Sequence, residues 1–283
     1  MRAAATNGVD RFGALVTVGG TMTVGSNCFV YAWSDILNTG SPHFEVGNLN
    51  VAEGGTFTAT RRGGAGARQG SYHVYGKSTG GNNYVGGGHG GKGGRATASA
   101  GCVCDDAVRP KLVGAGGGTA SGYGCGGAGG GIVQVAAASG TIRIDGTVSA
   151  DGESASEFGS GGAGGTVLLE ARQLLVGESG RITAKGGGIS PTSIAVGGGG
   201  GGRIALYAGQ PWSETLPRSR TVKSEEPFSV EAYPGEFLYL GPPPDVSGGI
   251  VIGGTAANGM PGDPGTVRYC HVNEAPGLML LVR

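Results

Sequence analysis

Apolar and polar residues alternate along the middle of the chain. Between residues 141 and 152 one parity is apolar and the other polar, with Ile142, Ile144, Val148 and Ala150 set against Arg143, Asp145, Thr147 and Ser149. The run 167–176 repeats the pattern with Val167, Leu169 and Ala171, followed by Leu174 and Val176. A period of two is typical of a β-strand with one buried face. No stretch of ten residues has convincing helical spacing, so the pattern predicts an all-β chain.

The N-terminal third carries a less regular version of the same pattern. Short alternating runs are separated there by Gly or Asn, which favour turns. We expect strands at residues 14–18, 20–24, 44–46, 48–51 and 55–59.

The middle of the chain also repeats. Glycine tracts at 126–132, 161–167 and 198–204 recur at intervals of 35 and 37 residues, and alternating strands accompany them. Strands this short cannot bury an apolar face alone, but successive copies can stack and bury it together. The sequence therefore predicts a right-handed parallel β-helix, that is, a β-solenoid.

Glycine dominates the composition, at 65 of 283 residues. The tracts could be flexible linkers, since glycine loses the most backbone freedom on ordering. They also show a three-residue phase, Gly-Gly-Ala-Gly-Gly-Gly at 126–131, which matches an extended left-handed helix with three residues per turn. Such helices can exchange N–H···O=C bonds with their neighbours. Because the tracts recur in register with the strands, we favour ordered, polyglycine II-like segments.

Composition divides the chain into two parts. Residues 1–208 are expected to form the glycine-rich β-solenoid, with regular repeats at 126–208. Residues 209–283 gather Pro, Glu and Arg and then return to short apolar runs, which predicts an irregular arm followed by C-terminal strands.

The order of these segments resembles a glycine-rich repeat module of large plant, algal and bacterial cell-surface proteins. The resemblance covers about residues 86–207, through the glycine run 86–94, the strand 140–152, the run 161–169 and the run 198–207. It implies an extracellular, β-helical protein with a structural or adhesive role. It carries over no catalytic residue.

Charge and hydropathy narrow the partners and the location. Lys plus Arg equal Asp plus Glu at 20 each, so the chain has no basic field for nucleic acid. Apolar runs such as 278–282 are far too short to span a bilayer, and residues 1–8 lack the apolar core of a signal peptide. We expect self-association, binding to other surface or fibre proteins, or binding to glycans, at an extracellular, cell-surface or particle-surface location.

The five cysteines favour a disulfide over a metal site. Cys102-Val103-Cys104 is too tightly spaced for a zinc knuckle, and no histidine shows ligand spacing around it. Because a covalent link stabilises a loosely packed glycine-rich region, we expect Cys125 to bond Cys102 or Cys104. The odd count leaves one thiol that is either buried or bonded to a neighbouring subunit.

Catalytic and nucleotide-binding motifs are not expected. The run from Gly86 to Lys92 begins like a phosphate loop, but Gly93 stands where a hydroxyl must hold magnesium. The densest charged cluster is Asp105, Asp106 and Arg109, which we interpret as a solvated loop. A polysaccharide-degrading β-helix enzyme would need these carboxylates. We predict no catalytic residue, no cofactor and no metal.

A few aromatic residues could contact glycans. The candidates are Trp33, Tyr72, Tyr75, Tyr84 and Trp212. For the three tyrosines we favour capping of the stack interior over sugar stacking. The sequence as a whole predicts a non-catalytic structural component of an extracellular surface, fibre, wall or particle coat. A carbohydrate-binding or adhesion module is the alternative, and a glycan-degrading enzyme comes third.

Overall fold

The computed structural model describes most of the chain, and every regular element in it is a β-strand. The described residues are 13–35, 40–68, 84–95, 101, 103–119, 124–155, 158–189, 196–209, 221–222, 236–251 and 259–272. Within these ranges there is no helix, and thus none that could cross a membrane. The prediction of an all-β chain is confirmed for this part of the protein.

The strands form two sheets, a long one of eight strands and a short one of four. The long sheet has the order β1 (Leu15–Val24), β3 (His43–Val51), β5 (Ile132–Ile144), β7 (Thr166–Val176), β9 (Arg203–Gly209), β12 (Thr266–Val272), β10 (Thr221–Val222), and β11 (Phe237–Tyr239) also pairs with β7. The short sheet has the order β2 (Phe29–Tyr31), β4 (Thr56–Thr58), β6 (Thr147–Ser149), β8 (Arg181–Thr183). All pairs are parallel except β10 with β12.

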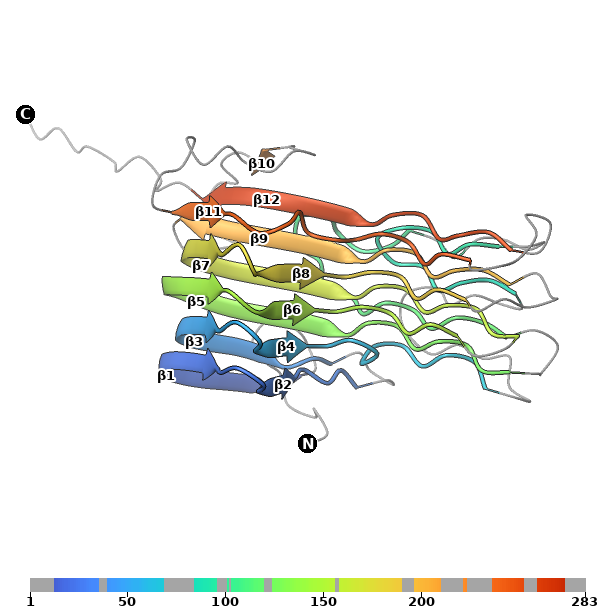
Figure 1. Cartoon of the computed structure of the whole chain (residues 1–283), viewed down its shortest axis with the longest axis horizontal. Coiled ribbons are helices and arrows are strands. Elements are labelled where there is room, and N and C mark those ends of the chain that lie inside the picture. Colours follow the sequence, from blue (N-terminus) through green and yellow to red (C-terminus); the bar gives the residue numbers. More distant parts are fainter. Residues whose placement is uncertain are drawn as a thin grey trace, which may run out of the picture.

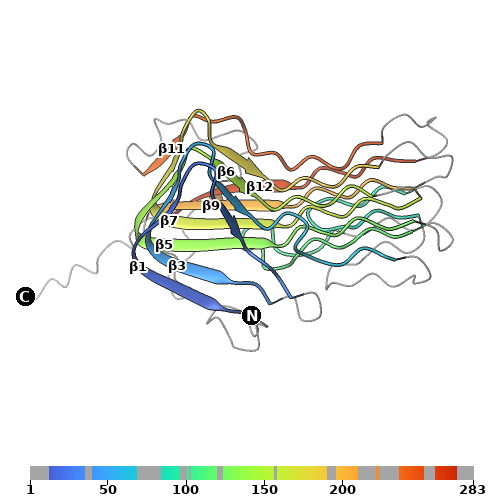
Figure 2. The same cartoon turned by 60° about the horizontal axis from the view of Figure 1, so that its bottom comes forward.

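Along the chain, β1, β3, β5 and β7 are each followed by a strand of the short sheet, and Figure 1 shows these copies lying one beside the next. The long strands turn toward the short sheet part-way along (Figure 2), and their pairing registers shift at that bend. A Cβ on Gly47 would collide with the carbonyl oxygen of Gly20, and one on Gly140 with that of Gly47. Glycine at this corner therefore lets successive strands approach closely.

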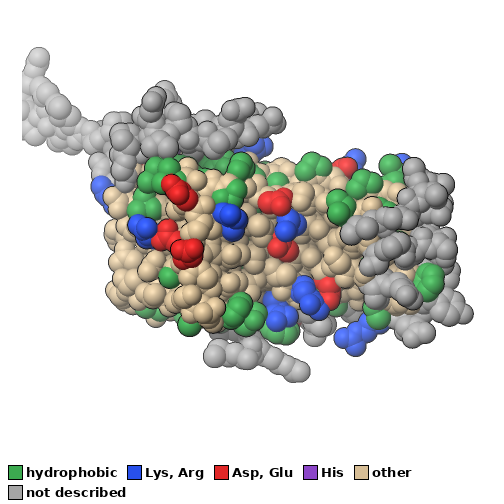
Figure 3. All heavy atoms as spheres, viewed as in Figure 1, with side chains coloured by type: hydrophobic (Ala, Val, Ile, Leu, Met, Phe, Trp, Pro, Cys, Tyr) green, Lys and Arg blue, Asp and Glu red, His purple; other side chains and the backbone are tan. Residues whose placement is uncertain are grey.

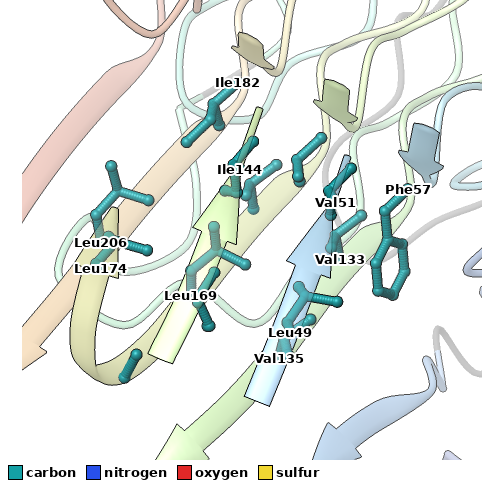
Figure 4. Close-up of a cluster of buried hydrophobic side chains, with 14 of the residues drawn as sticks. Leu49, Val51, Phe57, Val133, Val135, Ile144, Leu169, Leu174, Ile182 and Leu206 are labelled. Carbon is teal, nitrogen blue, oxygen red and sulfur yellow. The ribbon is translucent and has the colours of Figure 1, made fainter. Parts of the chain in front are cut away.

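The core lies between the two sheets and is built from apolar side chains stacked in register (Figure 4). In the long sheet Leu49 pairs with Ile142, which pairs with Leu174. In the short sheet Phe57, Val148 and Ile182 align in the same way. Each of these side chains is at most 1% exposed, and burying a side chain of this size contributes about 1.5–3 kcal/mol.

The predicted alternation is confirmed where it was clearest. Ile142, Ile144, Val148 and Ala150 are fully buried, whereas Arg143 and Asp145 pair on the outside. In the N-terminal third the strands expected at 14–18 and 20–24 form one strand, β1, with a register shift between Val18 and Thr21. Beyond the expected boundary at residue 208, β11 and β12 join the long sheet.

The glycine-rich stretches extend from the sheets as side-by-side segments, which together we call the glycine layer (Figures 1 and 2). Within residues 159–165, three successive amides donate to three different neighbouring segments, and the fourth returns to the first. The pairs are Gly161 to Gly197, Gly162 to Glu153, Ala163 to Ala115 and Gly164 to Gly200. Segment 126–131 alternates likewise, with Gly126 to Ala67, Gly127 to Ser160, Gly129 to Gly64 and Gly130 to Ala163. The neighbouring segment to which an amide donates therefore repeats every three residues.

Sterics explain why most positions in this layer are glycine. A Cβ on Gly164 would overlap the carbonyl group of Ala184, and that backbone is itself fixed by hydrogen bonds with Asp245 and Gly202. The neighbouring Ala163 is fully buried with its methyl group accommodated. A side chain is thus tolerated only where the three-residue phase leaves space.

We predict that Gly164→Ala lowers the free energy of unfolding by about 2 kcal/mol, because overpacking of a fixed site costs about 1–3 kcal/mol. Urea denaturation followed by circular dichroism measures the change. The matched control is Gly19→Ala, since nothing lies within 4 Å of a Cβ added at Gly19. The steric account is wrong if the two variants lose the same stability.

Candidate functional site

The outer face of the short sheet carries an exposed row of aromatic residues at its edge. Phe29, Tyr31 and Trp33 occupy alternate positions on and just after β2, and they are 58%, 55% and 61% exposed. The rings of Phe29 and Tyr31 are stacked with centroids 6.1 Å apart. The Arg62 guanidinium lies 4.0 Å from the Trp33 ring centroid and 5.3 Å from that of Tyr31. We call Phe29, Tyr31 and Trp33 the aromatic edge.

The other predicted glycan contacts lie elsewhere. Tyr84 is half-buried and packs against a small apolar cluster formed by Ala155, Ile189 and Val196. Tyr72, Tyr75 and Trp212 lie outside the described residues. Of the five candidates, the structure therefore places Trp33 on an exposed surface and Tyr84 against an apolar cluster.

A groove of about 610 Å³ opens on the same side of the molecule, where the short sheet continues into the glycine layer. Glycine backbone forms part of its lining, and polar side chains with two isoleucines form the rest. The lining residues are Thr60, Asp151, Gly152, Ser154, Lys185, Gly186, Gly187, Gly188, Ile189, Asp245, Ser247, Gly248 and Ile250. Figure 3 shows acidic and basic side chains together on this face.

Successive repeats of the stack each contribute at least one polar residue to the groove. Backbone bonds from Arg61 to Asp151, from Gly152 to Lys185 and from Gly186 to Ser247 join the layers. This register aligns Thr60, Asp151, Lys185 and Ser247 in a row along the stack. With strands about 4.8 Å apart, the row spans about 14 Å.

Two carboxylates and one ammonium group give the groove a mixed charge. Asp151 accepts hydrogen bonds from the Thr183 hydroxyl at 3.0 Å and from the Lys185 amide at 2.7 Å. Burial raises the pKa of Asp151, and the charge of Asp245 adds to this, although both hydrogen bonds and the Lys185 charge act against it. Asp245 Oδ1 accepts the Ser247 amide at 2.9 Å.

The amides of the groove floor are already paired within the protein. Gly152 donates to Lys185 O, Gly186 to Ser247 O and Gly187 to Gly162 O. Gly188 donates to the Ser154 hydroxyl. The donors that this part of the groove presents to a ligand are therefore on its side chains.

A covering loop, residues 103–112, lies across the outer face of the long sheet. Val108 packs against Leu168, Ala205 and Tyr207, and the Tyr207 hydroxyl donates to Val108 O at 2.5 Å. Arg109 pairs with the nearly buried Glu170, whose pKa is raised by burial against the opposing charge of Arg109. Arg203 donates to Cys104 O.

Sequence reasoning missed this covering loop, although one signal was present. Residues 167–169 are apolar at three consecutive positions, as are 204–207 at four. Continuous apolar runs are typical of strands buried on both faces.

Asp105 lies in this loop, and the expectation that its cluster is solvated is wrong for it. Its side chain is 6% exposed and lies 3.2 Å from Nε2 of the fully buried His89. Asp105 also accepts the backbone N–H groups of Asp106, Lys111 and Leu112. These bonds close the loop around the carboxylate, which explains why it is buried rather than solvated.

His89 connects the covering loop to the glycine layer. Its Nδ1 lies 2.9 Å from the carbonyl oxygen of Gly164. Both ring nitrogens of His89 thus face oxygen atoms that can accept a hydrogen bond, the carbonyl of Gly164 and the carboxylate of Asp105. Burial alone would raise the pKa of Asp105, but the hydrogen bond and charge of His89 and the backbone donors outweigh it, so this pKa is lowered.

The structure describes four of the five cysteines, Cys28, Cys104, Cys125 and Cys270, and no disulfide forms among them. Cys102 lies outside the described residues. The bond expected between Cys125 and Cys104 is therefore wrong for this structure, and the alternative bond between Cys125 and Cys102 stays a prediction. Cys270 is buried beside Tyr207, and burial raises the pKa of its thiol to about 11.

Within the described ranges, no three His, Cys, Asp or Glu side chains come together as a metal site would require. No family model matches the chain, and no curated protein or solved structure matches it either. The resemblance of its repeats to cell-surface modules therefore stays a prediction.

We predict that Asp105→Asn lowers the free energy of unfolding by about 3 kcal/mol at pH 7, because it breaks a buried ion pair. The pKa of Asp105 is lowered from 3.8 on folding. The carboxylate therefore stabilises the fold above that value, and this contribution is lost as the pH falls through the folded-state pKa. Urea denaturation between pH 7 and pH 2 should show the difference between wild type and variant shrinking below about pH 4.

Asp106→Asn serves as the control, because Asp106 is exposed and an Asn there can still accept the Val108 amide. It should change stability little at any pH. A pH-independent loss for Asp105→Asn would contradict the electrostatic account.

Proposed function

We propose that this chain is a non-catalytic structural component of an extracellular surface, fibre, wall or particle coat. Its strands and glycine segments would form the coils of a right-handed β-solenoid with polyglycine II-like segments. The element order supports this arrangement, since a long strand, a short strand and glycine-rich segments recur as β5, β6 and the described residues 150–155 and 158–165, then as β7, β8 and 184–189 and 196–202.

The observation that carries the proposal is the hydrogen bonding of the glycine layer. Each segment there is joined to neighbours in several directions, whereas a β-strand is joined in two. Donors and acceptors come from segments far apart in the sequence, as in the bond from Gly87 to Gly161. Cross-links of this kind resist both bending and separation of the segments, as a load-carrying element requires.

The proposed location and partners rest on the resemblance of the repeats to cell-surface modules. Self-association, or association with other surface or fibre proteins, fits a stack whose edge strand β1 has one described neighbour, β3. Asp105 does not support the alternative of a glycan-degrading enzyme, because His89 and three backbone amides surround its carboxylate.

We predict slow amide hydrogen exchange in the glycine segments 113–118, 126–131, 159–165 and 196–202. Their protection should be comparable with that of β5 and β7, because most of their amides are hydrogen-bonded and most of their residues are buried. Exchange measured by mass spectrometry on the intact protein provides the test. Exchange as fast as in an unstructured peptide would mean that the segments are linkers and would overturn the structural role.

We also expect antibodies against this chain to label the wall, a surface fibre or a particle coat in sections of the source material. Immunogold electron microscopy gives the location directly. Serum pre-absorbed with the purified protein is the control. Labelling confined to the cell interior would contradict the proposed location while leaving the exchange result intact.

A further inference from the structure

We propose that the groove and the aromatic edge form a binding site for a linear, uncharged polysaccharide. This goes beyond the structural role, because a stack that only bears load requires no ligand site. The proposal rests on the type of groups in the groove, their charge, and their arrangement along the stack.

Side chains supply the hydrogen-bond donors of the groove. The amides of Gly152, Gly186, Gly187 and Gly188 are engaged inside the protein, so these glycines offer no N–H group to a peptide strand. The side chains of Thr60, Asp151, Lys185, Asp245 and Ser247 surround this glycine backbone and are available to a ligand. Carboxylates only accept, an ammonium only donates, and hydroxyls do both. The hydroxyl groups of a sugar can satisfy all three kinds.

The charge of the groove favours a neutral ligand. The groove holds two carboxylates and one ammonium, and Glu153 beside it is paired with Arg61. Asp151 and Asp245 would repel an anionic polymer such as nucleic acid or a polyuronate. A neutral polymer with many hydroxyl groups avoids this cost and can accept from Lys185.

The aromatic edge offers a stacking surface beside the groove. Three neighbouring aromatic side chains, each more than half exposed, form a surface suited to a partner with flat apolar faces. Pyranose rings present such faces through their C–H groups. Arg62 covers one side of the Trp33 ring at 4.0 Å and so holds it in place.

The edge and the groove belong to one surface. Trp33 follows β2, the neighbouring strand β4 leads to Thr60, and Thr60 lines the groove two residues before Arg62. The row of Thr60, Asp151, Lys185 and Ser247 then continues for about 14 Å along the stack. Several sugar units could lie in this row, so the site is suited to a chain rather than a single sugar.

Affinity electrophoresis of the purified protein tests the proposal directly. The gels contain hydroxyethylcellulose, galactomannan or arabinoxylan as neutral polymers, and polygalacturonate as the charged comparison. We expect retardation by at least one neutral polymer, unchanged by chelator and by 0.5 M NaCl, because salt screens charge attraction but affects hydrogen bonds and stacking little.

Two variants separate the two parts of the site. Asp245→Asn keeps an oxygen for the Ser247 amide but removes the charge, and Trp33→Ala removes an exposed ring. Each should weaken binding about tenfold, the scale of one charge-assisted hydrogen bond or one aromatic contact. Matched controls are Glu178→Gln and Leu15→Ala, which alter an exposed carboxylate and an exposed apolar side chain away from the groove. Both controls should bind like wild type.

Several outcomes would overturn the proposal. The proposal is wrong if no neutral polymer retards the protein, if all four variants are retarded equally, or if polygalacturonate alone retards it. Loss of binding with chelator would instead indicate a cation held between Asp151 and Asp245, and it would overturn the proposal too. None of these results affects hydrogen exchange in the glycine segments, so the site and the structural role are tested separately.

Discussion

The whole structure depends on one constraint, namely that every buried amide needs a hydrogen-bond partner. A chain with 65 glycines has too few side chains to bury a large apolar core throughout its length. In the glycine layer the pairing of amides between neighbouring segments takes the place of that core. This arrangement works only if backbones come within hydrogen-bonding distance of one another on several sides. An added Cβ at Gly161 or Gly164 would occupy that space, so the constraint dictates the composition as well as the geometry.

The sheets and the glycine layer support each other. The stacked columns of Leu49, Ile142 and Leu174 hold successive copies in register through hydrophobic burial. Because segments such as 126–131, 159–165 and 196–202 lead directly into β5, β7 and β9, register in the sheets aligns these segments as well. The bond from Ala150 to Thr183 and the bond from Gly152 to Lys185 show one ladder passing without a break from the short sheet into the layer. The apolar core thus sets the alignment of the glycine segments, which have almost no side chains that could fix their own register.

The different roles of the apolar core and the glycine layer explain which features could be predicted from the sequence. Alternation in the sequence predicts the buried face formed by Ile142, Ile144, Val148 and Ala150. The three-residue phase of residues 126–131 predicts the three-residue repeat of the glycine segments. Which segments become neighbours was not predictable, because glycine carries no pattern to distinguish one partner from another. Segment 113–118, for example, is hydrogen-bonded to both 126–131 and 159–165, which are also bonded to each other, although it precedes both in the chain. The covering loop was missed for a different reason: the burial of Asp105 depends on His89 and on backbone donors that only the fold brings together. The groove likewise draws its residues from successive repeats, and no local motif marks such a row.

A fold held by backbone contacts leaves its outward side chains unusually free to vary. In the row of Thr60, Asp151, Lys185 and Ser247, residues of quite different chemistry occupy equivalent places in consecutive layers. The ladder through these layers is formed by main-chain groups, so it does not depend on which side chain stands at each place. A row of this kind can therefore acquire a ligand-binding surface without loss of the structure beneath it. The aromatic edge follows the same logic, since Phe29, Tyr31 and Trp33 project outward from a strand whose inward neighbour Val30 packs on the core. A protein built on this principle can combine a rigid interior with a surface adapted to a partner, because the two depend on different atoms.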